Sequence, residues 1–137
     1  MTRRSADIDW KALERAASAV RRRAHAPYSK FLVGAALLAE DGRVFLGANV
    51  ENASYGLSLC AERSAIAAAV AAGAKKFRAL AIASAGRRPA TPCGMCRQVM
   101  AEFPPAFAVV CFTRSARVKS DTTALLPMGF GPSYLGR

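Results

Sequence analysis

The alternation of hydrophobic and polar positions predicts a chain in which helices and strands follow one another. The segment from Asp7 to Ser29 carries hydrophobic residues at helical spacing, namely Trp10, Leu13, Ala17 and Val20. Asp7 or Asp9 is placed to cap the start of this helix, and the arginines at 21–23 suit the negative end of its dipole. Pro27 is expected to stop it.

The next segments, FLVGAALLA and RVFLGANV, flank Asp41 and Gly42, a pair that favours a hairpin turn. They are expected to form two antiparallel strands. The alanine-rich run CAERSAIAAAVAAG begins with polar groups and ends at Gly73, which predicts a helix. RALAIAS and FAVVCFT are typical of buried strands, and CRQVMAEF between them of a helix that Pro104 and Pro105 end. RVKS predicts a short last strand and TTALLP a final helical turn.

Strands that alternate with helices predict an α/β fold: a three-layer α/β/α sandwich with a mixed sheet of about five strands. The length of 137 residues is that of one domain, so a single domain is expected over residues 1–137. No apolar run approaches the ~18 residues of a membrane span. The N-terminus lacks the apolar segment of a secretory signal, so a cytoplasmic protein is expected.

The formal net charge of +11 raises the question of nucleic-acid binding. The charges gather at 21–23, 75–78 and 86–88, and these clusters lack the series of interleaved aromatic residues that would act as stacking platforms. This distribution predicts solvated faces and helix ends, with nucleic-acid binding that is at most weak and non-specific.

The motif PCGMC places Cys93 and Cys96 three residues apart, a spacing that suits a redox dithiol, a structural zinc site or a catalytic metal site. Cys60 opens the preceding predicted helix, and Glu62 follows two residues later. If the two helix starts converge, three thiolates meet in a region of positive dipole potential that favours metal binding. A redox dithiol leaves Cys60 and Glu62 unexplained.

Three ligands and a nearby carboxylate that does not bind the metal are what a catalytic zinc site requires, because the fourth position stays open. A structural site needs a fourth ligand. Cys111 lies in the middle of a buried strand, where a small core residue is expected, and His25 near a helix end is expected to be a surface cap.

The C-A-E and P-C-x-x-C motifs resemble those of the cytidine deaminases of the small, homotetrameric, zinc-dependent type. The resemblance runs from about Trp10 to Leu135 and is carried by APYSKFLVGAAL, GANVENASYG, CAERSAI, PCGMCRQVMAEF and LLPMGFGP. It implies hydrolytic deamination of free cytidine and 2'-deoxycytidine to uridine and 2'-deoxyuridine in pyrimidine salvage, with one Zn²⁺ per subunit.

The resemblance also implies roles for individual residues. Cys60, Cys93 and Cys96 would bind zinc, Glu62 would carry protons, and Arg63 would donate hydrogen bonds to the ligand thiolates and offset the net −1 charge of a three-thiolate zinc site. The nucleoside would contact Phe31, Asn49, Glu51, Ala53, Tyr55, Ala61 and Phe130. Phe130 would come from a neighbouring subunit, so the homotetramer would complete each active site. Phe31, at the start of a predicted strand, also fits an ordinary core position.

Two other functions remain open from the sequence. One is deamination of a modified cytosine nucleoside or of cytosine within nucleic acid. The segment NVENAS argues for a free nucleoside, since a pocket that bonds both ribose hydroxyls leaves little room for a polynucleotide. The other is a zinc-stabilised, basic nucleic-acid-binding module without enzymatic activity, and the net charge is the only feature that supports it.

Overall fold

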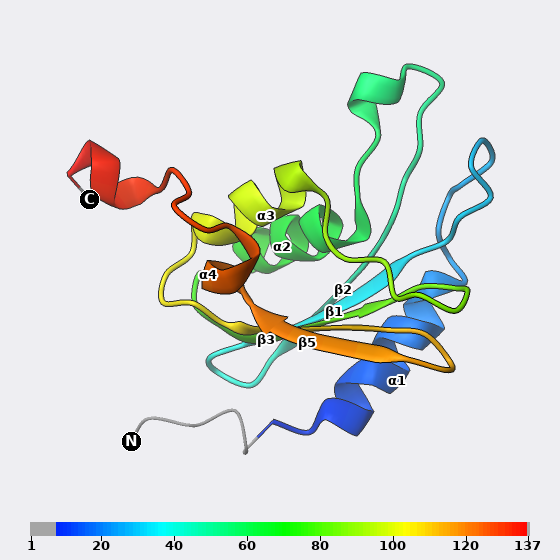
Figure 1. The fold of residues 1–137 in the computed structure, drawn as a ribbon, viewed down its shortest axis with the longest axis horizontal. Helices are drawn as coiled ribbons and strands as arrows, with labels where there is room; N and C mark the ends of the chain where they lie inside the picture. Colours follow the sequence, from blue (N-terminus) through cyan, green and yellow to red (C-terminus); the bar gives the residue numbers. More distant parts are fainter. Residues whose placement is uncertain (1–7, 137) are drawn as a thin grey trace.

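A five-stranded mixed sheet forms the centre of the computed structural model, which describes residues 8–136 (Figure 1). The strand order is β2-β1-β3-β4-β5, and only β3 and β4 run parallel. The strands are β1 (Gly34–Ala39), β2 (Val44–Ala48), β3 (Phe77–Ala83), β4 (Ala108–Phe112) and β5 (Arg117–Asp121). The mixed five-stranded sheet confirms the sequence prediction.

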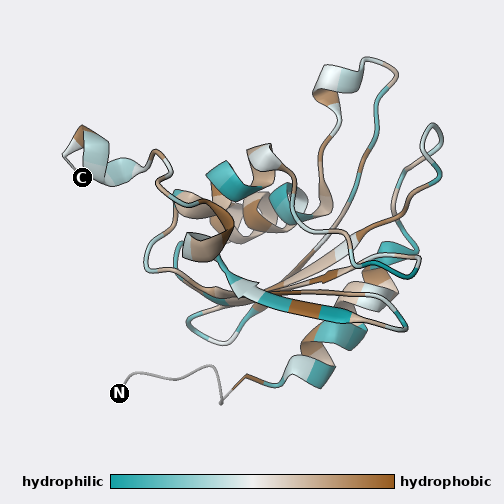
Figure 2. Cartoon of the chain, viewed as in Figure 1, coloured by the Kyte–Doolittle hydropathy of each residue, from teal (hydrophilic) through white to brown (hydrophobic). Residues whose placement is uncertain are grey.

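Helices cover both faces of the sheet, which makes the three layers of the predicted sandwich (Figure 1). One face packs against α1 (Trp10–Arg21), and the other against α2 (Ala61–Ala71) and α3 (Gly94–Ala101). Three short elements complete the fold: α4 (Thr122–Leu125) and the 3₁₀ turns η2 (Tyr55–Leu57) and η3 (Pro132–Leu135). Figure 2 shows hydrophobic residues along the central strands and mostly hydrophilic ones along the edge strand β5. Within residues 8–136, no helix has the length and apolarity needed to cross a membrane.

The first helix starts as predicted and ends earlier than predicted. The Asp9 side chain accepts a hydrogen bond from the Ala12 amide at 3.1 Å and so caps the N-terminus, while Asp7 lies outside the described residues. The helix stops at Arg21, six residues before Pro27, because the chain is drawn into pairing with the segment after β2. The His25 amide donates to Asn49 O at 2.9 Å, and His25 O accepts from the Glu51 amide at 2.8 Å. The prediction that His25 is a helix cap is therefore wrong.

Two glycines let helices approach the sheet closely. A Cβ atom on Gly34 would lie 2.1 Å from the Ala17 carbonyl oxygen of α1, and one on Gly47 would lie 2.3 Å from the Ala61 carbonyl oxygen of α2. Backbone atoms cannot yield at such distances, so only glycine fits at either position. Gly47 thereby fixes how close the first turn of α2 lies to β2.

The starts of α2 and α3 lie at the same end of the sheet. Gly34, which begins β1, is paired with the last residues of both neighbouring strands, Ala48 of β2 and Ala83 of β3. The chain leaves β2 at Ala48 and β3 at Ala83 and then enters α2 and α3 respectively. The fold thus places both helix N-termini, which carry the predicted metal ligands, at the same end of the sheet.

Candidate functional site

The three predicted thiol ligands meet at the two helix N-termini. Cys60 is the N-cap residue of α2 and Cys93 that of α3, and neither thiol is used to cap its own helix. The Sγ atoms of Cys60 and Cys93 are 3.7 Å apart, and those of Cys93 and Cys96 are 3.5 Å apart. All three sulfur atoms lie within 4.8 Å of one another.

This thiol cluster fits a zinc ion. Ligands at the usual Zn–S bond length of about 2.3 Å in tetrahedral geometry have sulfurs about 3.8 Å apart, close to the separations found here. The backbone N–H groups of both first turns place positive potential around the sulfurs and favour their anionic form. A dithiol site would use only Cys93 and Cys96, whereas the third thiol, Cys60, completes a metal-binding set. Three thiols leave one tetrahedral position open, as a catalytic site requires.

Arg63 lies against the thiol cluster instead of extending into solvent. Its Nη2 donates hydrogen bonds to Cys60 Sγ at 3.6 Å and to the Ser58 carbonyl at 3.3 Å. The pKa of Cys60 is lowered to about 5, because its sulfur accepts hydrogen bonds from the Cys96 thiol and from this guanidinium. The hydrogen bond to Cys60 in turn raises the pKa of Arg63. The guanidinium therefore offsets thiolate charge.

Glu62 is buried beside the cluster, with 5% of its surface exposed. Burial raises the pKa of this carboxyl, and the nearby Cys60 sulfur raises it further. The potential ligand atoms that lie within 4.8 Å of one another belong to the three cysteines, and the Glu62 carboxylate is not among them. A buried carboxyl whose pKa moves toward neutrality can both take up and release a proton, which is the property required of a general acid and base.

The two residues considered as a fourth ligand lie apart from the thiol cluster. Cys111 is on β4, is buried and packs in the core shared with α2 and α3, as the sequence predicts. Burial raises the pKa of its thiol to about 12. His25 belongs to the exposed segment between α1 and β1. The group of potential metal ligands found among residues 8–136 contains the three cysteines and neither of these two.

The Asn49 side chain is already engaged with the protein. Its Oδ1 accepts from the Val33 amide at 2.8 Å and its Nδ2 donates to Phe31 O at 2.9 Å. Asn49 therefore holds the segment 31–33 in place, a role for which the sequence analysis found no signal. The amide retains one lone pair and one N–H for a ligand, so a nucleoside contact is still possible in this arrangement.

Glu51 belongs to a small pocket of about 350 Å³ that is lined by Tyr28, Ser29, Glu51, Tyr55 and Ser58. Its Oε1 accepts from the amides of Tyr28 and Ser29, each at 3.1 Å, and its Oε2 accepts from the Ser29 hydroxyl. These bonds, with that of the Ser29 hydroxyl first, lower the pKa of Glu51. An ionised carboxylate with free lone pairs in a pocket this size is suited to a sugar hydroxyl.

The remaining predicted substrate contacts differ in how much of each residue is exposed to solvent. Ala61 is fully buried in the first turn of α2, and Ala53 is exposed in the loop after β2. Phe31 precedes β1 and is 41% exposed, so the interpretation of Phe31 as a core residue is wrong. Tyr55 is 75% exposed and Phe130 is 55% exposed. Both lie on segments that project from the body of the molecule (Figure 1).

Three residues that the sequence did not single out also support the site. Ser29 bonds Glu51, and Tyr28 packs edge to face on Tyr55 with ring centroids 6.1 Å apart. Arg97 donates to Pro92 O at 2.7 Å and to Leu125 O at 3.0 Å, which ties the segment before Cys93 to α4. The position of Arg97 directly after Cys96, at the start of a helix, was the available signal.

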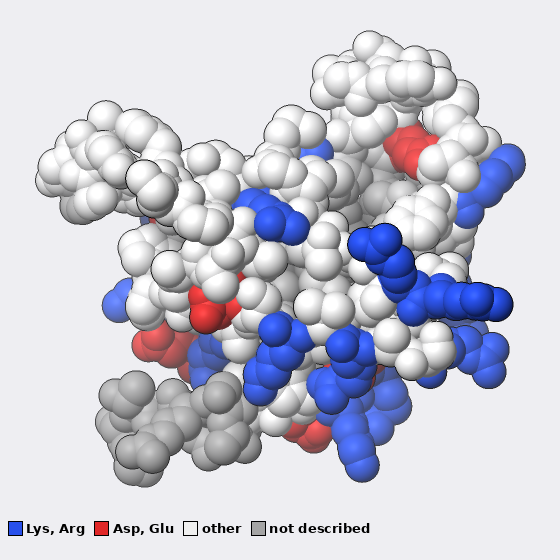
Figure 3. All heavy atoms as spheres, in the orientation of Figure 1, with Lys and Arg blue, Asp and Glu red and all other residues white. Residues whose placement is uncertain are grey.

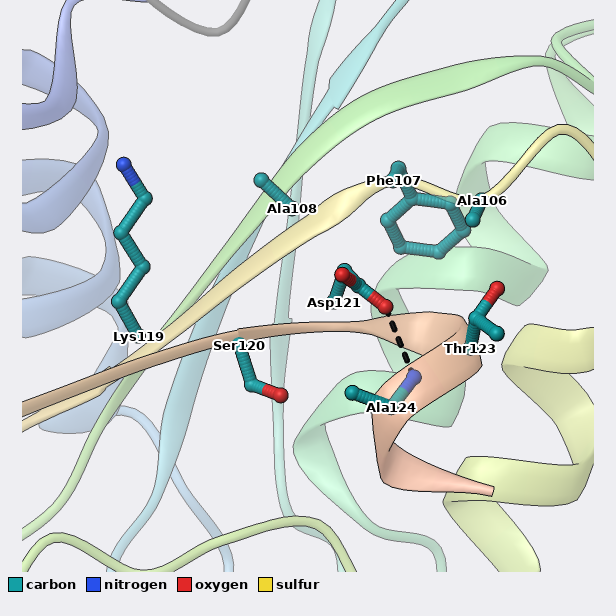
Figure 4. A pocket seen from close by; sticks show the side chains of 8 residues that line it. All are labelled: Ala106, Phe107, Ala108, Lys119, Ser120, Asp121, Thr123 and Ala124. Atoms are coloured by element: carbon teal, nitrogen blue, oxygen red, sulfur yellow. Dashed lines mark hydrogen bonds between the residues drawn. The ribbon is translucent and has the colours of Figure 1, made fainter. Parts of the chain in front are cut away.

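A second pocket, of about 480 Å³, lies at the edge of the sheet between β4, β5 and α4 (Figure 4). Its carboxylate, Asp121, accepts a hydrogen bond from the Ala124 amide at 2.8 Å and so caps α4 (Figure 4). Its lining residues include none of the clustered thiols. We assign this pocket no catalytic role.

Comparison with known proteins places these features in a family. A model of the cytidine and deoxycytidylate deaminase zinc-binding region matches residues 8–113. The cytidine deaminase of Halalkalibacterium halodurans is 52% identical over 99 residues, which cover 72% of this chain and 75% of the relative. That of Sporosarcina psychrophila is 46% identical over 117 residues, which cover 84% and 86%.

Solved structures agree in fold. The crystal structure of cytidine deaminase from Burkholderia pseudomallei superimposes with a TM-score of 0.86 at 47% identity, covering 90% of this chain and all of that one. The enzyme from Mycobacterium tuberculosis superimposes with a TM-score of 0.79 at 40% identity over 91% of this chain and 99% of that one. With three clustered thiols and a buried glutamate at the positions that the motifs indicate, this chain belongs to the cytidine and deoxycytidylate deaminase family of zinc-binding proteins.

Proposed function

We propose that this protein catalyses the hydrolytic deamination of free cytidine and 2'-deoxycytidine, releasing ammonia and the corresponding uracil nucleoside. One observation carries the proposal. Three thiols lie close enough together to bind a metal ion, and the neighbouring Glu62 is buried but does not belong to that set of ligands. Relatives at 46% and 52% identity bear the name cytidine deaminase, which supports the same substrate here.

Zinc is the cofactor of this site, held by Cys60, Cys93 and Cys96. When bound, zinc supplies a Lewis acid that makes water a nucleophile near neutral pH. Three thiolates weaken that effect, because they leave the site with a net −1 charge. Arg63 and the N-termini of α2 and α3 counteract this charge.

Glu62 carries the protons of the reaction. Water must lose one proton as it attacks C4 of the cytosine ring, and ring N3 must gain that proton. The hydroxyl now on C4 must then lose its proton, and the departing amino group must gain it. One carboxyl can relay both protons if its pKa is near neutrality, and burial shifts the pKa of Glu62 in that direction. The 5% exposure of Glu62 also keeps bulk water from competing for these protons.

The sugar is recognised by Glu51 and Asn49 in the loop after β2. Their remaining hydrogen-bonding capacity is directed at ribose hydroxyls, and Ala53 and Tyr55 line the same loop. The proposal also assigns the Ala61 backbone and the Phe31 ring to the base, and the 41% exposure of Phe31 supports the second contact. A pocket of this kind favours a free nucleoside over a polynucleotide, because a ligand that lacks the expected hydroxyls leaves the polar groups of the pocket without partners.

Assembly into a homotetramer completes the site, with Phe130 entering a neighbouring subunit. The exposure of Phe130 and Tyr55, on segments that project from the molecule, supports this proposal (Figure 1). We further propose that residues 1–137 form one domain and that the protein works in the cytoplasm, where the thiols stay reduced.

The test incubates purified protein, with its zinc content quantified, with cytidine and follows the loss of cytidine absorbance and the formation of uridine by chromatography. 2'-Deoxycytidine, a base-modified cytosine nucleoside and a cytosine-containing oligonucleotide are run in parallel. The expected result is turnover of the two free nucleosides that is lost after zinc is removed and returns when zinc is added. Preferred turnover of the oligonucleotide or the modified nucleoside would contradict the proposed substrate.

A further inference from the structure

Basic side chains line the outward side of α1. Lys11, Arg15 and Arg22 are exposed and recur at helical spacing, with Arg22 continuing the helical conformation as the C-cap. They span about 16 Å along the helix axis at 1.5 Å per residue. The opposite side of α1, which carries Leu13 and Ala17, is buried against the sheet. The row of cations therefore points away from the core.

Strand β5 and the turn before it extend this row. Arg117 pairs with Glu14 of α1 at 2.5 Å, and the Lys119 ammonium lies 5.7 Å from the centre of the Trp10 ring. Figure 4 shows the Lys119 side chain reaching toward α1, and Figure 3 shows Lys and Arg gathered over the α1 and β5 side of the molecule. We call the set the basic face, which consists of Lys11, Arg15, Arg22, Arg114, Arg117 and Lys119.

Little negative charge opposes the basic face. Glu14 is the single acidic residue within α1 and is already paired with Arg117, and the Asp9 carboxylate caps the helix. The acidic residue of β5, Asp121, likewise uses its carboxylate to cap α4. The lysines at 75 and 76 are in a different electrostatic setting. Lys75 and Lys76 share a surface hollow with two carboxylates, Glu40 and Asp41, which oppose their charge. Charge of one sign is thus concentrated on the α1 and β5 side.

We propose that the basic face binds the phosphate backbone of double-stranded nucleic acid without reading its sequence. A duplex carries one negative charge per about 1.7 Å of its axis, so the 16 Å of duplex beside this row carries roughly nine phosphates on its two strands. Each phosphate that a cation of the basic face neutralises releases counterions, which drives binding without any base contact.

The composition of the face favours a duplex over other anionic partners. Single-strand binding relies on aromatic side chains that stack on bases, and Trp10, the aromatic residue at this face, is half-buried next to Lys119. Membrane-surface helices insert an apolar side, but the apolar side of α1 is buried against the sheet. A rigid duplex needs only exposed cations.

The basic face and the thiol cluster lie in different layers. α1 packs on one face of the sheet, while the helices that carry the three cysteines pack on the other. A duplex held at α1 therefore stays on the far side of the sheet from Glu62, and its cytosines remain paired. The proposal is independent of the proposed function, because it uses no residue of the thiol cluster.

The experiment measures binding of fluorescent DNA and RNA duplexes of about 20 base pairs to the full chain by anisotropy over a range of salt concentrations. The test variant carries Lys11→Gln with Arg15→Gln, and the matched control carries Lys75→Gln with Lys76→Gln, which removes the same charge elsewhere. The slope of log K against log salt is negative, and each lost phosphate contact reduces its magnitude by about 0.9. The test pair should therefore reduce the magnitude of the slope by about 2, and the control pair should leave the slope unchanged.

Three results would overturn the proposal. They are the absence of duplex binding by the unmodified protein at low salt, an equal loss of binding in both variants, and tighter binding to phosphatidylserine vesicles or to single strands than to duplexes. Thermal melting of both variants checks their folding, and cytidine turnover should be the same in both, since neither pair lies in the candidate site.

Discussion

Cys60 shows how a single position serves structure and chemistry together. It begins α2 as the N-cap residue, yet its sulfur makes no capping bond and is left for Cys93 and Arg63. A better cap such as Ser or Asp would stabilise the helix by about 1 kcal/mol. The sequence gives up that stabilisation at Cys60 and again at Cys93, where the ligand thiols stand. Such local compromises are expected at functional sites.

Glu62→Gln should keep a full complement of zinc while losing nearly all turnover, because the amide preserves the shape of the side chain but cannot carry protons. Metal analysis and cytidine turnover on the same sample measure the two properties. Cys93→Ala is the contrasting variant and should lose zinc, whereas Cys111→Ala should retain it. Zinc loss in Glu62→Gln would mean that the carboxylate is itself a ligand.

Cys111 should make the protein sensitive to alkali. Burial raises the pKa of its thiol from 9.0 in the unfolded chain to about 12 in the folded protein, so the folded state favours the neutral form. Its contribution to stability is complete below pH 9 and is lost as the pH rises toward 12. Cys111→Ala leaves a small cavity but removes this titration.

Denaturant unfolding of both proteins from pH 8 to pH 11 tests this prediction, with the range set around the ordinary thiol pKa. The free energy of unfolding of the parent protein should fall faster with pH than that of Cys111→Ala, so the gap between them should narrow. A gap that stays constant across this range would contradict the burial effect.

At the scale of elements, local pattern was enough to predict most of the fold. The helices and strands appear where hydrophobic periodicity, the Asp41–Gly42 turn and the Gly73 terminus place them. The end of α1 was missed because the backbone pairing of His25 with the segment after β2 is a tertiary contact without a local signal. The bonds of Asn49 and Glu51 to the 28–33 segment escaped prediction for the same reason.

Gly47→Ala should destabilise the protein and weaken zinc binding together. The added methyl group would lie 2.3 Å from the Ala61 carbonyl oxygen, so the first turn of α2, which carries Glu62 and follows Cys60, must move away from β2. Gly94→Ala is the matched control. Gly94 lies between two ligand cysteines, but a Cβ there meets no atom within 4 Å.

Melting temperature and zinc affinity, measured by competition with a chromophoric chelator, give the readouts. Gly47→Ala should lower both, although it lies outside the ligand motifs, and Gly94→Ala should preserve both. The reverse order would show that the contact between α2 and β2 does not set the position of the thiols.

For the whole molecule, the notable feature is the exposure of large hydrophobic side chains on two projecting segments (Figure 1). Tyr55 and Leu57 lie on the segment with η2, and Phe130 and Leu135 on the C-terminal one. The sequence motifs named Tyr55 and Phe130, but a single chain cannot show which partner covers them. A contact between two copies of a chain leaves no hydrophobic periodicity or turn signal in the sequence, so such a contact cannot be predicted from local pattern.

Mixing two inactive variants should restore activity if Phe130 acts in a neighbouring subunit. Phe130→Ala keeps its own Glu62, and Glu62→Gln keeps its own Phe130, so a mixed assembly contains some sites with both intact. Co-refolded variants should recover part of the parental turnover, and each variant alone should recover little. Absence of rescue in mixed assemblies confirmed by mass would place Phe130 in its own subunit's site.

The thiol cluster joins parts of the chain that are far apart in sequence, since Cys60 and Cys93 are 33 residues apart with all of α2 and β3 between them. A metal ion bound to both Cys60 and Cys93 acts as a cross-link between them. As long as the metal stays bound, this cross-link closes a long loop of the chain. By the chain-entropy relation used for disulfides, closing such a loop is worth about 4 kcal/mol, against less than about 2 for the short Cys93–Cys96 loop alone. Removing zinc should therefore lower the melting temperature of the whole domain, and Cys60→Ala should reproduce most of that loss although the C-x-x-C pair remains.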